Sequence, residues 1–202
     1  SFTYIQKIPT YPKIIKFKAM NRFVLFFVLL VSSSCELPSI IQADQYVEPI
    51  PSELSSNVPD YESVWDRIKD ANPIKEESLD EKTLQYINGY LSNPVQLNKL
   101  LEKGRYFIYF VLEELERYRL PPELALLPYI ESNYDPFSIS ASGAMGIWQF
   151  MPATARIYGL RDTWWYEQRH DPLVSSKAAV RYLAYLHNRF NKEITYTLAA
   201  YN

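Results

Sequence analysis

The stretch PYIESNYDPFSISASGAMGIWQFMPATA, residues 128–155, carries most of what the sequence says about fold and function. It places Glu131 directly after the apolar run LALLPYI, and later combines two glycines with a Trp-Gln-Phe-Met cluster. A carboxyl group beside an apolar wall loses hydration, which penalises its charged form and raises its pKa. Such a group holds a proton near neutral pH and can act as a general acid toward an ether or acetal oxygen. The alternative is a solvated glutamate at a helix end.

Glycoside hydrolysis usually requires two carboxylates, so a second one is expected near Glu131 if the protein is a hydrolase. Asp135 is the nearest, but it precedes a proline in NYDPF, a pattern typical of a turn cap. If Glu131 acts alone, it must serve first as acid and then as base, and the substrate must supply the nucleophile. We expect Gly143 and Gly146 to provide positive φ angles in a turn or close backbone approach to sugar. Other glutamates are expected to be solvated helix residues: Glu113, Glu114, Glu116 and Glu123.

Helical periodicity dominates from about residue 61 onward, and no segment alternates as a strand would. The spacing of apolar residues predicts one long amphipathic helix over Pro94–Arg119. A second helix is expected from Pro121, kinked by Pro128 one turn before Glu131. Further helices are predicted over residues 152–159, over 175–190 and from residue 193. The fold class is therefore all-α.

Composition excludes several kinds of partner and site. The chain has 202 residues, is 48% hydrophobic and carries a net charge of −2, so no bulk basic field exists to hold nucleic acid. The only cysteine is Cys35, which rules out an internal disulfide, and the two histidines lie far apart, which argues against a metal site. Trp148 fits the core and a sugar platform equally well, whereas Trp164 and Trp165 are expected to pack against the protein.

The N-terminal part suggests export. Residues Met20–Cys35 contain one arginine, nine apolar residues and three serines, the parts of a secretory signal that is too short to span a bilayer. Cys35 after small residues resembles a lipobox and is a candidate lipidation site, although Ser32 stands where a leucine is usual. Residues 1–19 are expected to lie upstream of the initiator. Residues 36–60 have the composition of a flexible linker, and residues 61–94 form an N-terminal helical segment.

The motifs ES, SGAMGIWQFMPATA and AAYN, in this order, resemble the lytic transglycosylase family over about residues 95–202. The similarity is to the membrane-bound murein transglycosylase D type, whose catalytic domain has a goose-type lysozyme fold. It implies an exported enzyme without a cofactor that cleaves the MurNAc-β-1,4-GlcNAc bond of peptidoglycan glycan strands. In that family a single glutamate, matched by Glu131, protonates the bridging oxygen and then deprotonates the muramoyl C6 hydroxyl, which closes a 1,6-anhydro ring.

The resemblance also implies substrate-binding residues. Ser140 matches a hydroxyl near the N-acetyl group, Gln149 the polar residue of a GxxQ motif, and Met151 the floor beside the scissile bond. Tyr201 matches a tyrosine near the glutamate, with Asn202 in support. The family motif continues past AYN, so we expect residues 95–202 to be an incomplete catalytic domain.

Two alternatives remain open from the sequence. One is a muramidase on the same fold that releases a reducing end through water. The other is a peptidoglycan-binding protein with an inactive site. In either case the expected location is the bacterial cell envelope, as a monomeric, membrane-anchored lipoprotein in the periplasm.

Overall fold

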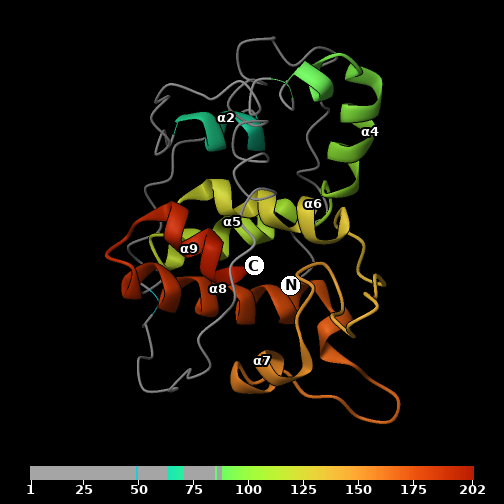
Figure 1. Ribbon diagram of the computed structural model, residues 1–202, viewed down its shortest axis with the longest axis vertical. Helices are drawn as coiled ribbons and strands as arrows, with labels where there is room; N and C mark the ends of the chain where they lie inside the picture. Colours follow the sequence, from blue (N-terminus) through green and yellow to red (C-terminus); the bar gives the residue numbers. More distant parts are fainter. Residues whose placement is uncertain (1–48, 50–62, 71–84, 86–87) are drawn as a thin grey trace, which may run out of the picture.

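The structure is a computed structural model that describes residues 49, 63–70, 85 and 88–202. It is mostly helical, and within the described residues the only β structure consists of three isolated bridges. The predictions for Met20–Cys35, for the linker and for much of residues 61–94 lie outside this part. The elements, shown in Figure 1, are α2 (Val64–Asp70), α4 (Pro94–Lys103), α5 (Ile108–Arg117), η3 (Pro122–Leu126), α6 (Leu127–Ser132), α7 (Pro152–Ile157), η4 (Gln168–His170), α8 (Pro172–Arg189) and α9 (Ile194–Tyr201).

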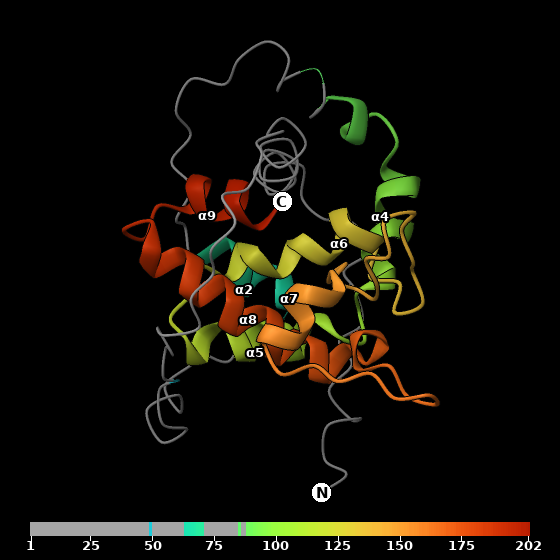
Figure 2. The same cartoon turned by 60° about the horizontal axis from the view of Figure 1, so that its bottom comes forward.

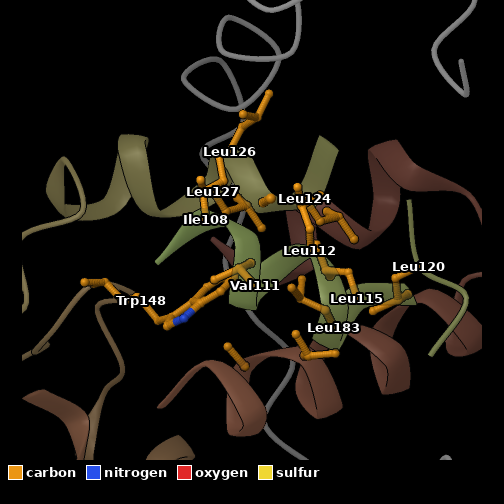
Figure 3. Close-up of a cluster of buried hydrophobic side chains, with 14 of the residues drawn as sticks. Ile108, Val111, Leu112, Leu115, Leu120, Leu124, Leu126, Leu127, Trp148 and Leu183 are labelled. Atoms are coloured by element: carbon orange, nitrogen blue, oxygen red, sulfur yellow. The ribbon is translucent and has the colours of Figure 1, made fainter. Parts of the chain in front are cut away.

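The core lies where α5 meets α8 and the η3–α6 segment (Figure 3). Apolar residues at helical spacing give α5 one fully buried face, and α8 supplies the opposing layer. Full burial of each such side chain contributes about 2 kcal/mol, which makes this contact the main source of stability. The central side chains with at most 1% exposure are Ile108, Val111, Leu112, Leu115, Leu124, Leu126, Leu127, Trp148 and Leu183.

The prediction of one helix over Pro94–Arg119 is wrong, because the structure has two helices separated at Gly104. Gly104 caps α4 and is buried where α4 approaches the rings of Tyr129 and Tyr134, so closely that a Cβ atom would overlap the Tyr129 hydroxyl. That hydroxyl donates a 2.7 Å hydrogen bond to the Leu101 carbonyl. Apolar periodicity continues through this position, so the pattern does not show the break.

The helix predicted from Pro121 also differs in detail. Its first part is the 3₁₀ helix η3, and an α-helix begins only at Leu127. Pro128 therefore occupies the first turn of α6, where its missing N–H is harmless, and does not kink a helix interior. The helix α6 is short and ends at Asn133, which adopts a left-handed conformation with φ of 56°.

The remaining predicted helices are confirmed as α7, α8 and α9. The Asp171 side chain caps α8 by accepting hydrogen bonds from the N–H groups of Leu173 and Val174, at 2.9 and 3.0 Å. Turned by 60°, Figure 2 shows the segment between α7 and α8 projecting away from the helices. No described helix is both long enough and apolar enough to cross a membrane.

The expectation that the other glutamates are solvated is wrong for two of them. Glu114 is only 5% exposed and pairs with Arg117 at 3.1 Å, and Glu123 is 9% exposed. Glu114 lies on α5 and Glu123 on η3, two elements that pack against each other in the core. Glu116 is partly exposed but forms an ion pair with Arg67 of α2.

Replacing Gly104 with alanine should destabilise the protein by about 2 kcal/mol, because the added Cβ must displace the buried Tyr129 ring. Urea denaturation followed by circular dichroism measures this change. Gly89→Ala is the matched control, because no other atom lies within 4 Å of the place that its new Cβ would take, and it should cost far less. Equal stability of the two variants would contradict the packing described for Gly104.

Candidate active site

Glu131 lies in the last turn of α6 and is half-buried. Burial raises the pKa of its carboxyl group from 4.5 to about 7. Among the described residues it has no ion-pair partner that would oppose this shift, so desolvation alone sets its direction. The group is therefore positioned to hold a proton near neutral pH, as the sequence predicted.

The residue after Glu131 fixes the helix to the glycine-containing loop. The Ser132 hydroxyl is close to two carbonyl oxygens, that of Pro128 at 3.3 Å and that of Ile147 at 3.0 Å. The first contact is local to α6, and the second joins α6 to residues 138–150. The side chain of Ser132 thus sets the distance between the candidate acid and this loop.

Tyr201 is brought to the same place from α9, at the far end of the sequence. Its hydroxyl donates a 2.9 Å hydrogen bond to the Trp148 carbonyl. Burial raises the pKa of Tyr201 well above its usual range, and the nearby charge of Glu131 adds to this effect. Tyr201 is therefore a neutral hydroxyl beside the candidate acid.

Trp148 belongs to the core and is not a sugar platform. It is 1% exposed, and its indole N–H donates to the Ser176 hydroxyl of α8 at 2.8 Å. Its carbonyl accepts from Tyr201, so this one residue connects the loop to both α8 and α9. Phe150, two residues further on, is also buried.

Gln149 holds a left-handed backbone conformation with φ of 47°. Its side-chain amide donates to the carbonyls of Gly146 and Ser138, at 2.9 and 3.3 Å, so its N–H groups brace the loop while its oxygen is left for other contacts. Gly146 has φ of 78°, and a Cβ there would overlap the Arg169 carbonyl. The expected positive φ is confirmed, and the close backbone approach seen here is to Arg169 of the protein itself.

The other predicted binding residues lie in the loop, directly before α7 and directly after α9. The Ser140 hydroxyl accepts from the Ala144 N–H and contacts Ser142, both at 2.9 Å, within its own turn. Met151 is 42% exposed just before α7. Asn202 is exposed after α9, next to Tyr201. No hydrogen bond between described residues joins Ser140 or Met151 to Glu131.

Asp135 is a turn cap, as expected. It is exposed, and its carboxylate accepts a 2.9 Å hydrogen bond from the Phe137 N–H. The second acid of the opening stretch is thus engaged in local structure. Among the described residues no group of three or more potential ligands is arranged to hold a metal ion.

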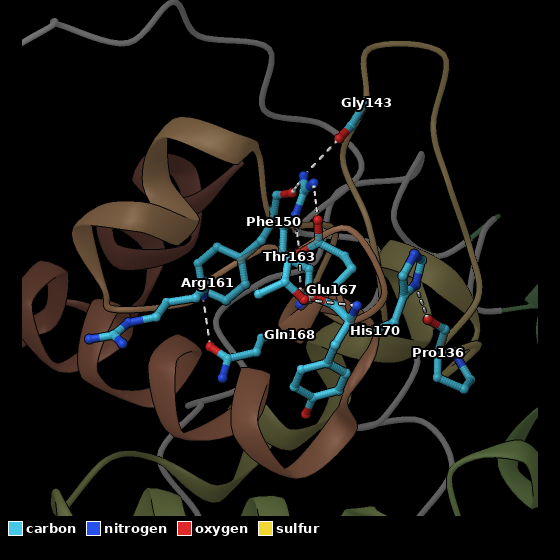
Figure 4. A network of polar contacts seen from close by, with 10 residues as sticks. Pro136, Gly143, Phe150, Arg161, Thr163, Glu167, Gln168 and His170 are labelled. Carbon is cyan, nitrogen blue, oxygen red and sulfur yellow. Dashed lines mark hydrogen bonds and ion pairs between the residues drawn. The ribbon is translucent and has the colours of Figure 1, made fainter.

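Arg169 connects the back of the loop to its surroundings, a role that sequence reasoning missed. Its partners Gly143, Phe150 and Glu167 are labelled in Figure 4. The buried guanidinium bonds both carboxylate oxygens of Glu167, at 3.0 and 2.7 Å, and donates to the carbonyls of Gly143 and Phe150, at 3.1 and 3.3 Å. It thereby connects both sides of the loop that carries Gln149. Glu167 and Arg169 do not belong to a periodic pattern of apolar residues. The only sign of their ion pair in the sequence is that opposite charges stand two residues apart in EQR.

Trp164 and Trp165 do not pack as predicted, since they are 95% and 70% exposed. They occupy the tip of a turn closed by Thr163 and Tyr166, whose backbone hydrogen bond is 2.8 Å long. The turn projects from the segment between α7 and α8 (Figure 2).

Comparison with known proteins shows what the C-terminal half of the chain is similar to. Residues 109–202 match the family described as the transglycosylase SLT domain. This part of the chain is therefore similar to that family, and the lysozyme-like helical fold expected from its motifs is confirmed.

The chain is also similar to two curated proteins. The chain is 36% identical over 113 residues to "Membrane-bound lytic murein transglycosylase D" of Escherichia coli strain K12, an overlap of 56% of this chain and 25% of the relative. It is 38% identical over 96 residues to "Putative tributyltin chloride resistance protein" of Alteromonas sp. strain M-1, covering 48% of this chain and 46% of the relative. The chain thus spans less than half the length of these relatives.

Glu131 should make stability depend on pH. Its folded pKa of about 7 exceeds the ordinary 4.5, so the folded state is relatively more stable below pH 4.5 and loses that advantage as pH rises to 7. Glu131→Gln should therefore unfold with a free energy about 3 kcal/mol higher than wild type at pH 8, and with little difference at pH 4. Chemical denaturation at both pH values measures the difference.

Glu193→Gln is the control for this comparison, because it removes a carboxylate from an exposed position. It should track the wild type at both pH values. If Glu131→Gln also tracks the wild type, the carboxyl group is not desolvated in the folded protein.

Removing Arg169 should loosen the loop. Arg169→Met leaves the Glu167 carboxylate without its partner and should cost about 2 kcal/mol at neutral pH. Arg169 lowers the pKa of Glu167 below the ordinary 4.5, so the ion pair stabilises the folded wild type only while Glu167 is charged. As the pH falls below 4.5 the wild type loses this stabilisation, and the difference in stability between wild type and Arg169→Met should shrink. Thermal denaturation against pH measures this, with exposed Arg156→Met as the control. A cost that is independent of pH would exclude an ionic origin.

Proposed function

We propose that this chain is part of a peptidoglycan lytic transglycosylase that cleaves the MurNAc-β-1,4-GlcNAc bond and leaves a 1,6-anhydro-MurNAc end. The observation that carries the proposal is a single desolvated carboxyl group, Glu131, with a pKa raised to about 7, in a region that matches the transglycosylase SLT domain. The other acid of the opening stretch, Asp135, does not share this environment, since it is an exposed turn cap.

In the first step protonated Glu131 gives its proton to the bridging oxygen, and the bond from that oxygen to C1 of the muramoyl residue breaks. A carboxyl group with a pKa near the working pH carries this proton in a useful fraction of molecules and releases it readily. The positive charge that develops at C1 is stabilised by the carboxylate that remains. The N-acetyl group of the same sugar assists at C1.

In the second step the Glu131 carboxylate takes the proton from the C6 hydroxyl of the muramoyl residue. The C6 oxygen bonds to C1, so the 1,6-anhydro ring closes and the acid is regenerated without consuming water. The neutral hydroxyl of Tyr201, fixed on the Trp148 carbonyl, lies close enough to be influenced by the charge of Glu131. We assign it to positioning the carboxyl group and the N-acetyl group.

The remaining substrate contacts are assigned to Gln149, Ser140, Met151 and Asn202. The oxygen of the Gln149 amide is the group that its own bracing contacts leave available for sugar hydroxyls. Ser140 lies in a turn of the same loop. Met151 directly follows the loop and is exposed, and its apolar side chain suits the face of a sugar ring. Asn202 supports Tyr201 from the end of α9.

The proposed setting is the bacterial cell envelope. A relative named as membrane-bound supports this, and the candidate signal of Met20–Cys35 adds lipidation of Cys35 as the proposed anchor. These residues lie outside the described part of the chain.

A muramidase on the same fold is the second candidate function. It would use Glu131 as the acid and a water molecule as the nucleophile, and its products would carry reducing ends. We favour the transglycosylase because the similarity covers named lytic transglycosylases.

Glu131→Gln in the complete protein should lower the rate of glycan cleavage by about a thousandfold or more, because the general acid and the later base are both lost. Binding to purified sacculi should be retained, because the amide keeps the shape of the side chain. The measurement is mass spectrometry of products from digested sacculi, which for the wild type should show anhydro ends.

Asp135→Asn is the matched control, since the amide oxygen can still cap the turn, and it should keep near wild-type activity. Reducing ends in the wild-type products would identify a muramidase. Undiminished turnover by Glu131→Gln would refute the assignment of the acid, and binding without any cleavage by the wild type would indicate a binding protein.

A further inference from the structure

The turn of residues 163–166 presents two adjacent tryptophans that no other part of the described chain covers. Trp164 is 95% exposed, more than any other large apolar side chain in the described residues, and Trp165 is 70% exposed. Single apolar side chains are common on protein surfaces, whereas a contiguous exposed pair marks an interaction site. The turn therefore suits a partner outside the described chain.

Hydrogen bonds within the turn hold these side chains away from the helices. The Thr163 N–H donates to the Tyr166 carbonyl at 2.8 Å, and the Tyr166 N–H donates to the Thr163 hydroxyl at 3.0 Å. Next to the turn, the Arg161 N–H donates to the Gln168 side chain at 2.7 Å (Figure 4). The Tyr166 hydroxyl donates to Asp171, the N-cap of α8, at 2.7 Å. A turn that is already ordered loses little entropy when it meets a partner.

The exposure of Trp164 distinguishes a bilayer from a sugar. A sugar stacks on one face of an aromatic ring, and the protein packs against the other face. Trp164 has both faces and its N–H edge in solvent, since it is 95% exposed. The bilayer interface surrounds an inserted side chain and accommodates both the apolar ring and the polar N–H of an indole. Trp165 stacks on Tyr166 with ring centroids 5.7 Å apart, so the turn combines the two residue types enriched at that interface.

The charges beside the turn favour an anionic surface. Residues 152–166 contain three charged side chains, Arg156, Arg161 and Asp162, which are exposed and form no ion pair with a described residue. Two cations and one acid give this segment a net charge of +1, although the whole chain carries −2. Cations close to a bilayer are attracted to its anionic headgroups.

The anchor proposed above would keep the domain near a bilayer. Residues 36–60 have the composition of a linker, and about 25 such residues have a root-mean-square length on the order of 30 Å. A folded unit of the size of residues 88–202 has a diameter of about 35 Å. A tether from Cys35 that is no longer than the domain is wide brings the turn into repeated contact with the bilayer, so that a weak insertion is sufficient.

We propose that Trp164 and Trp165 insert into the interface of a phospholipid bilayer that carries anionic headgroups, and hold the domain with Glu131 against the membrane. The turn supplies none of the residues assigned above to catalysis or substrate binding. The contact therefore sets where the domain lies and not what reaction it performs. Only the tether in this inference rests on the proposed anchor at Cys35.

Fluorescence of the tryptophans themselves measures the insertion. The complete protein carries Cys35→Ser, so that no lipid anchor contributes, and is mixed with vesicles of phosphatidylethanolamine and phosphatidylglycerol with brominated acyl chains. Bromine quenches indoles that reach the acyl chains, so the turn should be quenched and Trp148, buried in the core, should not. Trp164→Ala/Trp165→Ala should lose this quenching and bind the vesicles about tenfold more weakly, because two indoles remain in water.

Val95→Ala/Tyr106→Ala is the matched control, because it removes two apolar side chains of similar exposure, 65% and 64%, from another part of the surface. It should bind the vesicles as the protein with the intact turn does. Vesicles of phosphatidylcholine alone should bind the intact turn about fivefold more weakly, because they carry no net charge. The proposal is overturned if the intact turn is not quenched, if the tryptophan variant binds equally well, or if both kinds of vesicle bind alike.

Purified sacculi, which contain no bilayer, separate this inference from the proposed reaction. Trp164→Ala/Trp165→Ala should digest them at a rate close to that of the wild type and give the same anhydro products. Weaker binding of this variant to sacculi, together with no quenching of the intact turn, would identify a glycan platform and overturn the membrane contact. Absence of anhydro products from wild-type digests contradicts the proposed function instead, and the vesicle measurement then decides on the turn separately.

Discussion

Glu131 loses water on folding without gaining a cation, and the rest of the site follows from this imbalance. Burial makes the charged form costly and raises the pKa of the carboxyl group to about 7. An arginine or lysine beside the group would reverse the shift and leave a permanent carboxylate unable to donate a proton. The folded protein thus gives up some stability at neutral pH to keep this acid protonated.

The loop around Trp148 holds that environment together. Ser132 contacts the loop from α6, Tyr201 reaches it from α9, and the indole of Trp148 is fixed on Ser176 of α8. Arg169 then ties the back of the loop to the segment before α8. The candidate acid is consequently positioned by contacts between residues 132 and 201, which lie far apart in the chain and close in space.

The all-α fold and the helices α7, α8 and α9 could be predicted because apolar spacing, prolines and helix caps are local signals. The identity of Glu131 as the candidate acid was also accessible, since an apolar run before a lone acid is visible in the sequence. The break at Gly104 was not, because it depends on the Tyr129 ring from another helix. The burial of Glu114 was missed too, because it also depends on how elements pack against one another and not on the local sequence.

The positioning residues were the least predictable part of the site. Arg169 acts through carbonyls of Gly143 and Phe150, and backbone acceptors leave no trace in a sequence. The exposure of Trp164 also went against expectation, because composition favours burial of tryptophan while the turn that carries it projects from the fold.

Proton occupancy of the Glu131 side chain tests the central claim most directly. Carbon-13 NMR of its carboxyl carbon, assigned by comparison with Glu131→Gln, follows ionisation of this one group as the pH is varied. A midpoint at about 7 is the result that desolvation predicts. A midpoint near the ordinary 4.5 would mean that the carboxyl group is hydrated or paired, and that it cannot act as the acid described above.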